Sequence, residues 1–132
     1  MPFPVDNDFI DRAAAKLGIR FPPSFVAHLH RSNGGEIDVA DDTWQIFPVF
    51  DDSDPRRLKR TSNDIVRETK LAREWPGFPS NGVAIASNGT GDKLVFLPSE
   101  PEDRLAGRVY WWDHETGELT AVADDFSDFV DD

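Results

Sequence analysis

Three short stretches of this 132-residue chain hold side-chain types that could do chemistry. The first, WWDHE, places His114 between Asp113 and Glu115, and a carboxylate–histidine pair can act as a general acid and base. Residues adjacent in sequence rarely orient one another, however, and no nucleophile motif such as G-x-S-x-G accompanies this one. We therefore interpret DHE as a charged turn at the end of a strand.

The second stretch, SNGTGD at residues 87–92, has the glycine content of a phosphate-binding loop. A dinucleotide fingerprint needs a third glycine, where this chain has Leu94, and a following helix, where this chain continues with strand-like residues. No P-loop pattern matches either. We predict a hairpin turn in which Gly89 and Gly91 supply positive φ angles and Asp92 accepts hydrogen bonds from local backbone N–H groups.

The third candidate is the H-x-H pair of His28 and His30, which could suggest a metal site. On a helix, residues two apart point about 200° away from each other, so the two rings cannot share an ion. The chain has no cysteine, which excludes disulfides and thiolate metal sites. The acidic stretches DVADD and DDSD lack the glycine and terminal glutamate of a calcium loop. We expect no metal, no cofactor and no catalytic residue.

Charge is the most unusual property of the composition. The net charge is −11, from 25 acidic and 14 basic residues. Seven of the bases and only two acids fall within residues 56–73, so the rest of the chain is more acidic still. Such a body repels nucleic acid and favours a basic partner, although the same charge also serves solubility.

We expect the partner to dock on acids in loops, with a tryptophan as anchor. The expected docking acids are Asp41, Asp42, Asp51, Asp52 and Asp54, joined by Asp113 and Glu115. Trp111 and Trp112 are adjacent on a predicted strand, so one faces the core and the other faces outward. The outward one could anchor a partner, because tryptophan is enriched in binding hot spots.

The elements that position these residues follow from hydrophobic periodicity and turn signals. Helices are predicted over residues 6–18, over 21–35 with a left-handed cap at Asn33–Gly34, and over 62–75, and a short one in the tail DDFSDFVDD. A strand is predicted from Asp42 and four more at VAIAS, KLVFL, RVYWW and LTAVA, and DDSDPRR is predicted to be a loop. We expect one α+β domain over residues 1–132, with a largely antiparallel sheet of about five to six strands packed against N-terminal, central and C-terminal helices.

The chain shows no signal peptide and no apolar segment near the roughly 18 residues of a membrane span. Together with the absence of cysteine, this favours a cytoplasmic protein without membrane contact.

The order of the motifs resembles the SUKH superfamily, which contains the Smi/Knr-type domains. The resemblance rests on five blocks in order: FPPSFVAHLHRSNGG, WQIFPVF, VAIASNGTGDKLVFLP, RVYWWDHETGE and VADDFSDFVDD. Phe21 departs from the pattern, since an aliphatic residue is usual there. The match runs from about residue 21 to residue 130.

The resemblance implies an α+β domain whose bacterial members are mostly immunity proteins that bind and neutralise toxins, often nucleases. It implies structural roles for Asn33, Gly34, Gly89, Gly91 and Asp92, and carries over no catalytic set. A cognate and basic toxin is therefore the expected partner. Two other functions remain open: a regulatory scaffold that binds an endogenous protein, as the fungal relatives suggest, and a hydrolase that uses His114.

Overall fold

The computed structural model describes residues 4–39, 41–99, 104–105 and 107–129. In this part of the chain the helices are α1 (Asn7–Leu17), α2 (Pro23–Arg31), α3 (Pro55–Arg60), α4 (Ile65–Ala72) and the 3-10 helix η1 (Phe126–Phe129). The strands are β1 (Glu36–Val39), β2 (Asp42–Ile46), β3 (Val83–Ser87), β4 (Lys93–Phe96), β5 (Pro98–Ser99), β6 (Arg104–Leu105), β7 (Val109–Trp112) and β8 (Leu119–Ala123).

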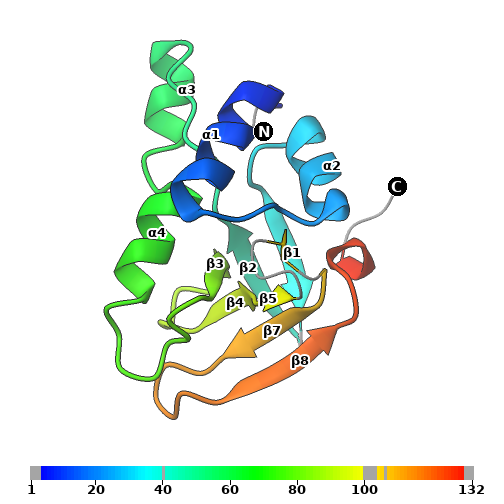
Figure 1. The fold of residues 1–132 in the computed structure, drawn as a ribbon, viewed down its shortest axis with the longest axis vertical. Helices are drawn as coiled ribbons and strands as arrows, with labels where there is room; N and C mark the ends of the chain where they lie inside the picture. The colour runs from blue at the N-terminus through cyan, green and yellow to red at the C-terminus, as the bar shows by residue number, and fades with distance from the viewer. Residues whose placement is uncertain (1–3, 40, 100–103, 106, 130–132) are drawn as a thin grey trace.

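Six of these strands form one sheet, with α1, α2 and α3 lying above it in the view of Figure 1 and α4 beside it. The strand order is β1-β2-β3-β4-β7-β8, and every neighbouring pair is antiparallel. Strands β5 and β6 pair with each other in a separate hairpin. The predicted α+β fold with an antiparallel meander is confirmed.

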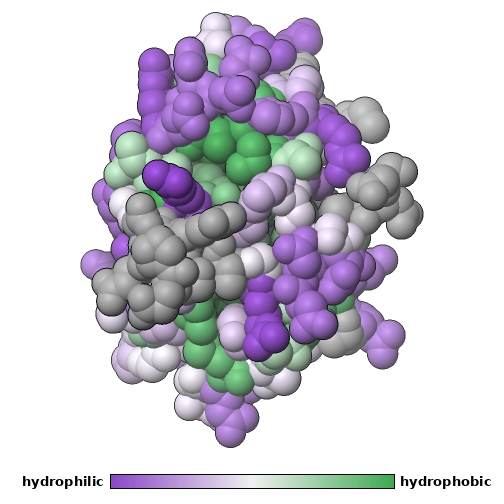
Figure 2. Space-filling view, turned by 45° about the vertical axis from the view of Figure 1, so that its right-hand side comes forward, coloured by the Kyte–Doolittle hydropathy of each residue, from purple (hydrophilic) through white to green (hydrophobic). Residues whose placement is uncertain are grey.

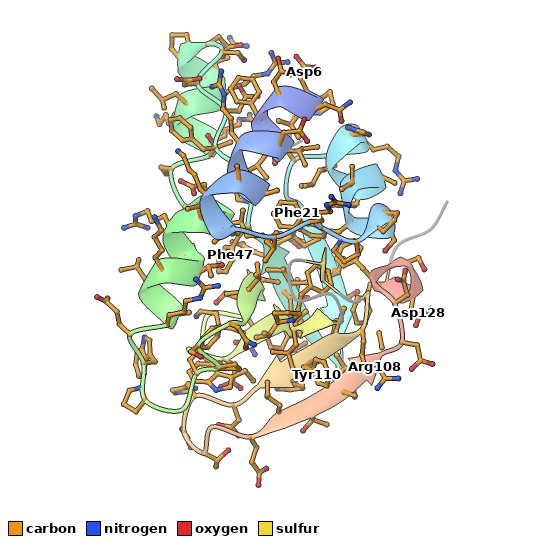
Figure 3. All side chains as sticks on the ribbon, in the orientation of Figure 1. Asp6, Phe21, Phe47, Arg108, Tyr110 and Asp128 are labelled. Atoms are coloured by element: carbon orange, nitrogen blue, oxygen red, sulfur yellow. The ribbon has the colours of Figure 1, made fainter. Side chains whose placement is uncertain are left out.

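The core lies where the helices meet the sheet. Phe25 of α2 packs edge-on against Phe96 of β4 and Phe126 of η1, with ring centroids 5.3 and 5.0 Å apart, and all three side chains are fully buried. Figure 3 shows Phe21 and Phe47 in the interior and Asp128 at the periphery. Burying three aromatic rings pins the C-terminal turn to the same core as α2, because each ring removes a large apolar area from water.

Helix α4 is attached to the sheet through a buried hydroxyl group. The Thr69 hydroxyl donates to the Ala84 carbonyl oxygen over 3.3 Å and accepts from the Ala84 N–H over 3.1 Å. Ile65, Thr69 and Ala72 are all buried, as their shared helical face predicts. Leu71 and Trp75, on the neighbouring face, are about half exposed.

The structure corrects two helix predictions. The second helix ends at Ser32 in an extended conformation, so Asn33–Gly34 does not cap it. The segment DDSDPRR is not a loop throughout, because α3 starts at Pro55. The side chains of Asp54 and Asp64 accept from the N–H groups of Arg57 and Arg67 over 2.9 and 3.0 Å, so each opens a helix of its own. Because each aspartate caps a new helix, the basic residues 56–73 lie on two helices, α3 and α4, rather than on one.

The strand predictions were incomplete at two places. Strand β1 was missed, and DVADD is a hairpin, in which β1 turns into β2 at Asp41 with φ 66°. The β5–β6 hairpin falls within a stretch predicted to be a turn. Both are too short, at four and two residues, to show a hydrophobic alternation that sequence could reveal.

The C-terminal tail forms the predicted short helix as a 3-10 turn. Asp125 caps it, because its carboxylate accepts from the Ser127 N–H over 3.0 Å. Asp128 reaches back to the N–H groups of Asp124 and Asp125. Phe126 is buried as predicted, whereas Val130 lies outside the described residues.

Candidate functional site

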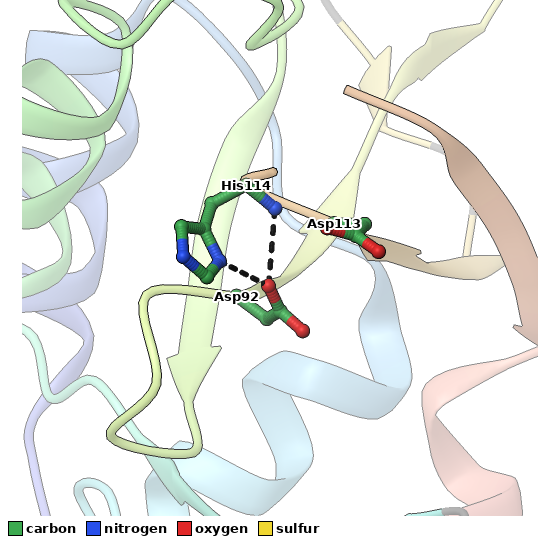
Figure 4. A group of neighbouring side chains, drawn as sticks. All are labelled: Asp92, Asp113 and His114. Atoms are coloured by element: carbon green, nitrogen blue, oxygen red, sulfur yellow. Dashed lines mark hydrogen bonds and ion pairs between the residues drawn. The ribbon is translucent and has the colours of Figure 1, made fainter. Parts of the chain in front are cut away.

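An aspartate–histidine pair joins two hairpin turns. One carboxylate oxygen of Asp92, in the β3–β4 turn, accepts from the His114 backbone N–H over 3.0 Å and lies 2.5 Å from His114 Nδ1 (Figure 4). The other oxygen accepts from Trp111 Nε1 over 2.9 Å. Asp92 therefore bonds across the sheet rather than to local backbone, which corrects the prediction for this residue.

The protonation of Asp92 follows from these contacts. Burial alone raises the pKa of its carboxyl, but the hydrogen bonds from the His114 side chain and backbone and from Trp111, with attraction to His114, outweigh burial. The net pKa of Asp92 is lowered, so the carboxylate is charged at neutral pH. Aspartate and histidine are residue types of acid–base catalysis. In this pair, however, their polar contacts hold the β3–β4 turn against the β7–β8 turn.

The predicted turn role of the two glycines is confirmed. Gly89 has φ 86° and Gly91 has φ 109°, both in the region that L-residues avoid. A Cβ on Gly91 would lie 3.0 Å from His114 Cδ2, whereas a Cβ on Gly89 would meet nothing within 4 Å. Gly91 thus allows the His114 ring to sit directly against the hairpin.

Asp92, Asp113 and His114 each offer a ligand atom, and these atoms lie within 4.8 Å of one another. Both Asp92 oxygens are already acceptors in the hydrogen bonds above. One oxygen of Asp113 accepts from the N–H groups of Glu115 and Thr116 over 2.8 and 3.4 Å. These hydrogen bonds already tie the three residues to neighbouring backbone and side chains, so we interpret the group as a clasp between turns.

Trp111 and Trp112 lie on opposite faces of β7, as predicted, but neither is openly exposed. Trp112 is 1% exposed and donates from Nε1 to the Gly77 carbonyl over 3.1 Å. Trp111 is half-buried and packs against Trp44, with ring centroids 5.2 Å apart. The exposed tryptophan is Trp75, at 51%, and its ring lies 6.0 Å from that of His114.

Three turns of the sheet gather at one end. Asn88 Nδ2 donates to Asp42 Oδ2 over 3.1 Å, which joins the β3–β4 turn to the β1–β2 turn, and the Asp92–His114 pair joins it to the β7–β8 turn. The acids of the two outer turns are exposed, apart from Asp113, which is half-buried. We call them the acidic turn surface: Asp38, Asp41, Asp42, Asp113, Glu115 and Glu118.

The remaining predicted docking acids lie elsewhere. Asp51 is 3% exposed and accepts from Ser53 Oγ over 2.6 Å, so the prediction that it lies on an open loop is wrong. Asp54 is occupied as the cap of α3, and only Asp52 is freely exposed. From Asp42, β2 leads away from the turn surface, and the chain continues past Pro48, whose carbonyl accepts from the Ile65 N–H at the start of α4, before it reaches Asp51. The predicted acidic face is therefore split, since the turn surface holds Asp41, Asp42, Asp113 and Glu115 without the 51–54 group.

The NGG segment contacts the chain that follows β2. Buried Asn33 donates from Nδ2 to the Val49 carbonyl over 2.9 Å and accepts from the Val49 N–H over 2.8 Å. Gly34 has φ 114°, and a Cβ on it would lie 3.2 Å from the Ile46 carbonyl oxygen. The Asn33 side chain therefore makes the two backbone hydrogen bonds that a neighbouring strand would otherwise make with Val49. Gly34 lacks a side chain, which allows its backbone to lie close to the Ile46 carbonyl.

The two histidines of α2 do not meet. His28 Nε2 lies 2.7 Å from the Gly34 carbonyl oxygen, whereas His30 contacts the side chain of Asn7. Desolvation by burial lowers the pKa of His28, despite the opposing hydrogen bond to Gly34. The predicted divergence of the two rings is confirmed, and His28 is a neutral packing residue at pH 7.

Residues 4–132 match the model of the SMI1 / KNR4 family (SUKH-1). The chain belongs to this SMI1/KNR4 family. No curated protein matches it. Membership in SMI1/KNR4 is consistent with an immunity-protein function. Among the described residues of this SMI1/KNR4 domain, no helix is long and apolar enough to cross a membrane.

Sequence reasoning missed two parts of this site. Asp92 and His114 are 22 residues apart, and nothing in either motif indicated that they meet. Trp75 falls within the helix predicted over residues 62–75, and the sequence did not single it out as an anchor. Its position before Pro76, where the helix cannot continue, was the available signal that it projects from a helix end.

Proposed function

We propose that this SMI1/KNR4 protein is an immunity protein, which binds a basic toxin and blocks it by covering its functional surface. Family membership supports a protein-binding role without catalysis. The observation that carries the proposal is the acidic turn surface, because its two outer turns concentrate negative charge at one end of the sheet.

The charge of this end is nearly all of one sign. Within residues 36–42, 87–93 and 113–119, the only basic side chains among the described residues are Lys93 and His114. Lys93 is half-buried and donates to the Gly91 carbonyl over 3.3 Å, and His114 is held by Asp92. A basic protein approaching this end meets exposed carboxylates first, which speeds association and suppresses acidic competitors.

An apolar anchor lies beside these acids. Trp75, three residues beyond the end of α4, is 51% exposed, and Leu71, in the last turn of α4, is 44% exposed. The edge contact with His114 holds the Trp75 ring in place, and Asp92 fixes His114 in turn. A large aromatic side chain that is already ordered loses little entropy on binding, so Trp75 fits the anchor role better than Trp111 or Trp112.

The proposal is tested with a basic toxin whose gene is found next to the gene for this chain. Co-expression of the two proteins in a sensitive host should restore growth, and the purified proteins should form a complex. Restored growth should be lost with Asp38→Lys combined with Glu115→Lys, since both acids belong to the docking surface.

The matched control combines Asp11→Lys with Asp52→Lys, which makes the same change in net charge at exposed sites elsewhere. The control should protect as well as the natural chain. If both double variants fold and protect equally, the acidic turn surface is not the docking site. If the natural chain gives no protection but binds an endogenous protein, the scaffold function replaces immunity.

A further inference from the structure

A groove between α1 and α4 combines an apolar floor with a basic rim. Its volume is about 680 Å³. Phe9 and Ala13 line it from α1, Val66 lines it from α4, and Phe50 lines it from the segment after β2. Ala13 and Val66 are buried, whereas Phe50 is 36% exposed. The floor therefore offers apolar area that water still reaches at Phe50.

Four cations surround this floor, two on each helix. Arg12 and Lys16 stand one turn apart on α1, and Arg67 and Lys70 stand three residues apart on α4. Two acids share the lining: Asp64 is engaged as the cap of α4, and Asp52 is exposed. The groove is thus locally positive in a protein whose net charge is −11.

Among the described residues, three of these four cations form no ion pair. Arg67 pairs with Glu68 over 2.7 Å. For Arg12, Lys16 and Lys70, no carboxylate oxygen lies within 4 Å among the residues that the structure describes, and Arg12 instead stands over the Phe9 ring at 5.2 Å. Like charges facing one another across an apolar floor repel, and an anion between them would relieve that repulsion.

We propose that this groove binds a free amphiphilic organic anion, a molecule with an apolar body and one carboxylate or similar acidic head. The apolar body packs on Phe9, Phe50 and Val66, and the head lies between Lys16 and Lys70. The volume falls in the range of small-molecule sites, about 300–1,000 Å³, which suits a body of about ten carbon atoms.

The rest of the surface argues against larger anions. A nucleic acid or an anionic membrane extends well beyond the groove and meets the acidic body, which repels it. A small amphiphile is confined to the groove and is repelled much less. The ligand class is therefore a free molecule rather than a lipid surface or a nucleic acid. This site is independent of the toxin-binding proposal.

The test uses three ten-carbon probes below their micelle-forming concentrations: decanoate, decyl maltoside and decyltrimethylammonium. Calorimetry and 15N NMR titration of the full chain should show one saturable site for decanoate, with shifts centred on Phe9, Phe50 and Val66. The neutral and cationic probes should bind at least about tenfold more weakly. Equal or tighter binding of the cation would overturn the proposal, because net charge would then dominate.

Two double variants separate the groove from general charge. Lys16→Gln with Lys70→Gln should weaken decanoate binding about tenfold, whereas Lys59→Gln with Arg20→Gln makes the same charge change at exposed sites outside the groove and should leave it unchanged. Phe50→Ser, at an exposed position, should weaken binding without loss of the fold. Equal effects of the two double variants would overturn the proposal, as would tighter binding to anionic phospholipid vesicles than to decanoate.

Discussion

At the scale of single residues, Gly91 and Asp92 fix the position of the His114 ring against the β3–β4 turn. Gly91 has a backbone angle that a side chain disfavours, and it leaves room for the His114 ring. Asp92 then holds that ring and the Trp111 indole. Sequence alone indicated a turn with positive φ angles, because asparagine and glycine favour such turns. It could not indicate His114 as the neighbour, since that contact depends on how two hairpins pair.

The two hairpin glycines should differ in their tolerance of alanine. Gly91→Ala should reduce the free energy of unfolding by about 1–3 kcal/mol, because strain at φ 109° adds to a contact 3.0 Å from the His114 ring. Gly89→Ala introduces strain alone and should cost less, about 1 kcal/mol. Urea unfolding of both variants measures the difference. Equal costs would show that the His114 contact contributes nothing.

At the scale of elements, the structure is a set of short hairpins joined by side-chain contacts between their turns. Strands of four or five residues have few cross-strand pairs, so bonds such as Asp92 to His114 and Asn88 to Asp42 help fix the relative position of neighbouring turns. Helix limits were only partly predictable. The apolar faces of α1 and α4 were visible in the sequence, whereas the division between α3 and α4 depends on two capping aspartates.

The link between the two hairpins should make stability depend on pH. The folded-state pKa of Asp92 lies below the ordinary value of 3.8, so its charged form stabilises the fold at pH values above 3.8. This stabilisation is lost as the pH falls through the lower folded-state pKa. Asp92→Asn should therefore cost about 1.5–3 kcal/mol at pH 7, the range for hydrogen bonds to charged groups.

The cost of Asp92→Asn should shrink as the pH falls from 3.8 through the lower folded-state pKa, because Asp92 takes up a proton first in the unfolded chain and then in the folded one. Denaturant unfolding between pH 7 and pH 2.5 measures it, with Asp52→Asn as the control at an exposed acid. A cost that stays constant down to the lowest pH would contradict an ionised Asp92 as the source.

At the scale of the whole molecule, charge is separated over the surface. The acidic turn surface occupies one end of the sheet, and the basic residues gather on α3 and α4. In Figure 2 one face is mostly hydrophilic, with an apolar hollow in the upper part where the helices lie. The molecule can thus present opposite charges to different ligands, which the net charge of −11 alone does not reveal.

Association with the proposed basic toxin should be steered by this charge. The association rate constant should fall as salt rises, since the Debye length shrinks from about 10 Å at 0.1 M to about 3 Å at 1 M. Asp38→Lys with Glu115→Lys should flatten this dependence in stopped-flow measurements, whereas Asp11→Lys with Asp52→Lys should change it much less. Equal slopes for the two variants would place the docking surface elsewhere.

The sequence by itself determined the fold class, the order of most elements, the turn role of Gly89 and Gly91, and the family resemblance. Each of these depends on local preferences or on motif order, and both are written along the chain. Only the tertiary structure decided which acids share a surface and which tryptophan is exposed. Asp51 and Asp42 look alike in sequence, yet one is buried and the other exposed, because burial depends on which distant segments pack over a loop.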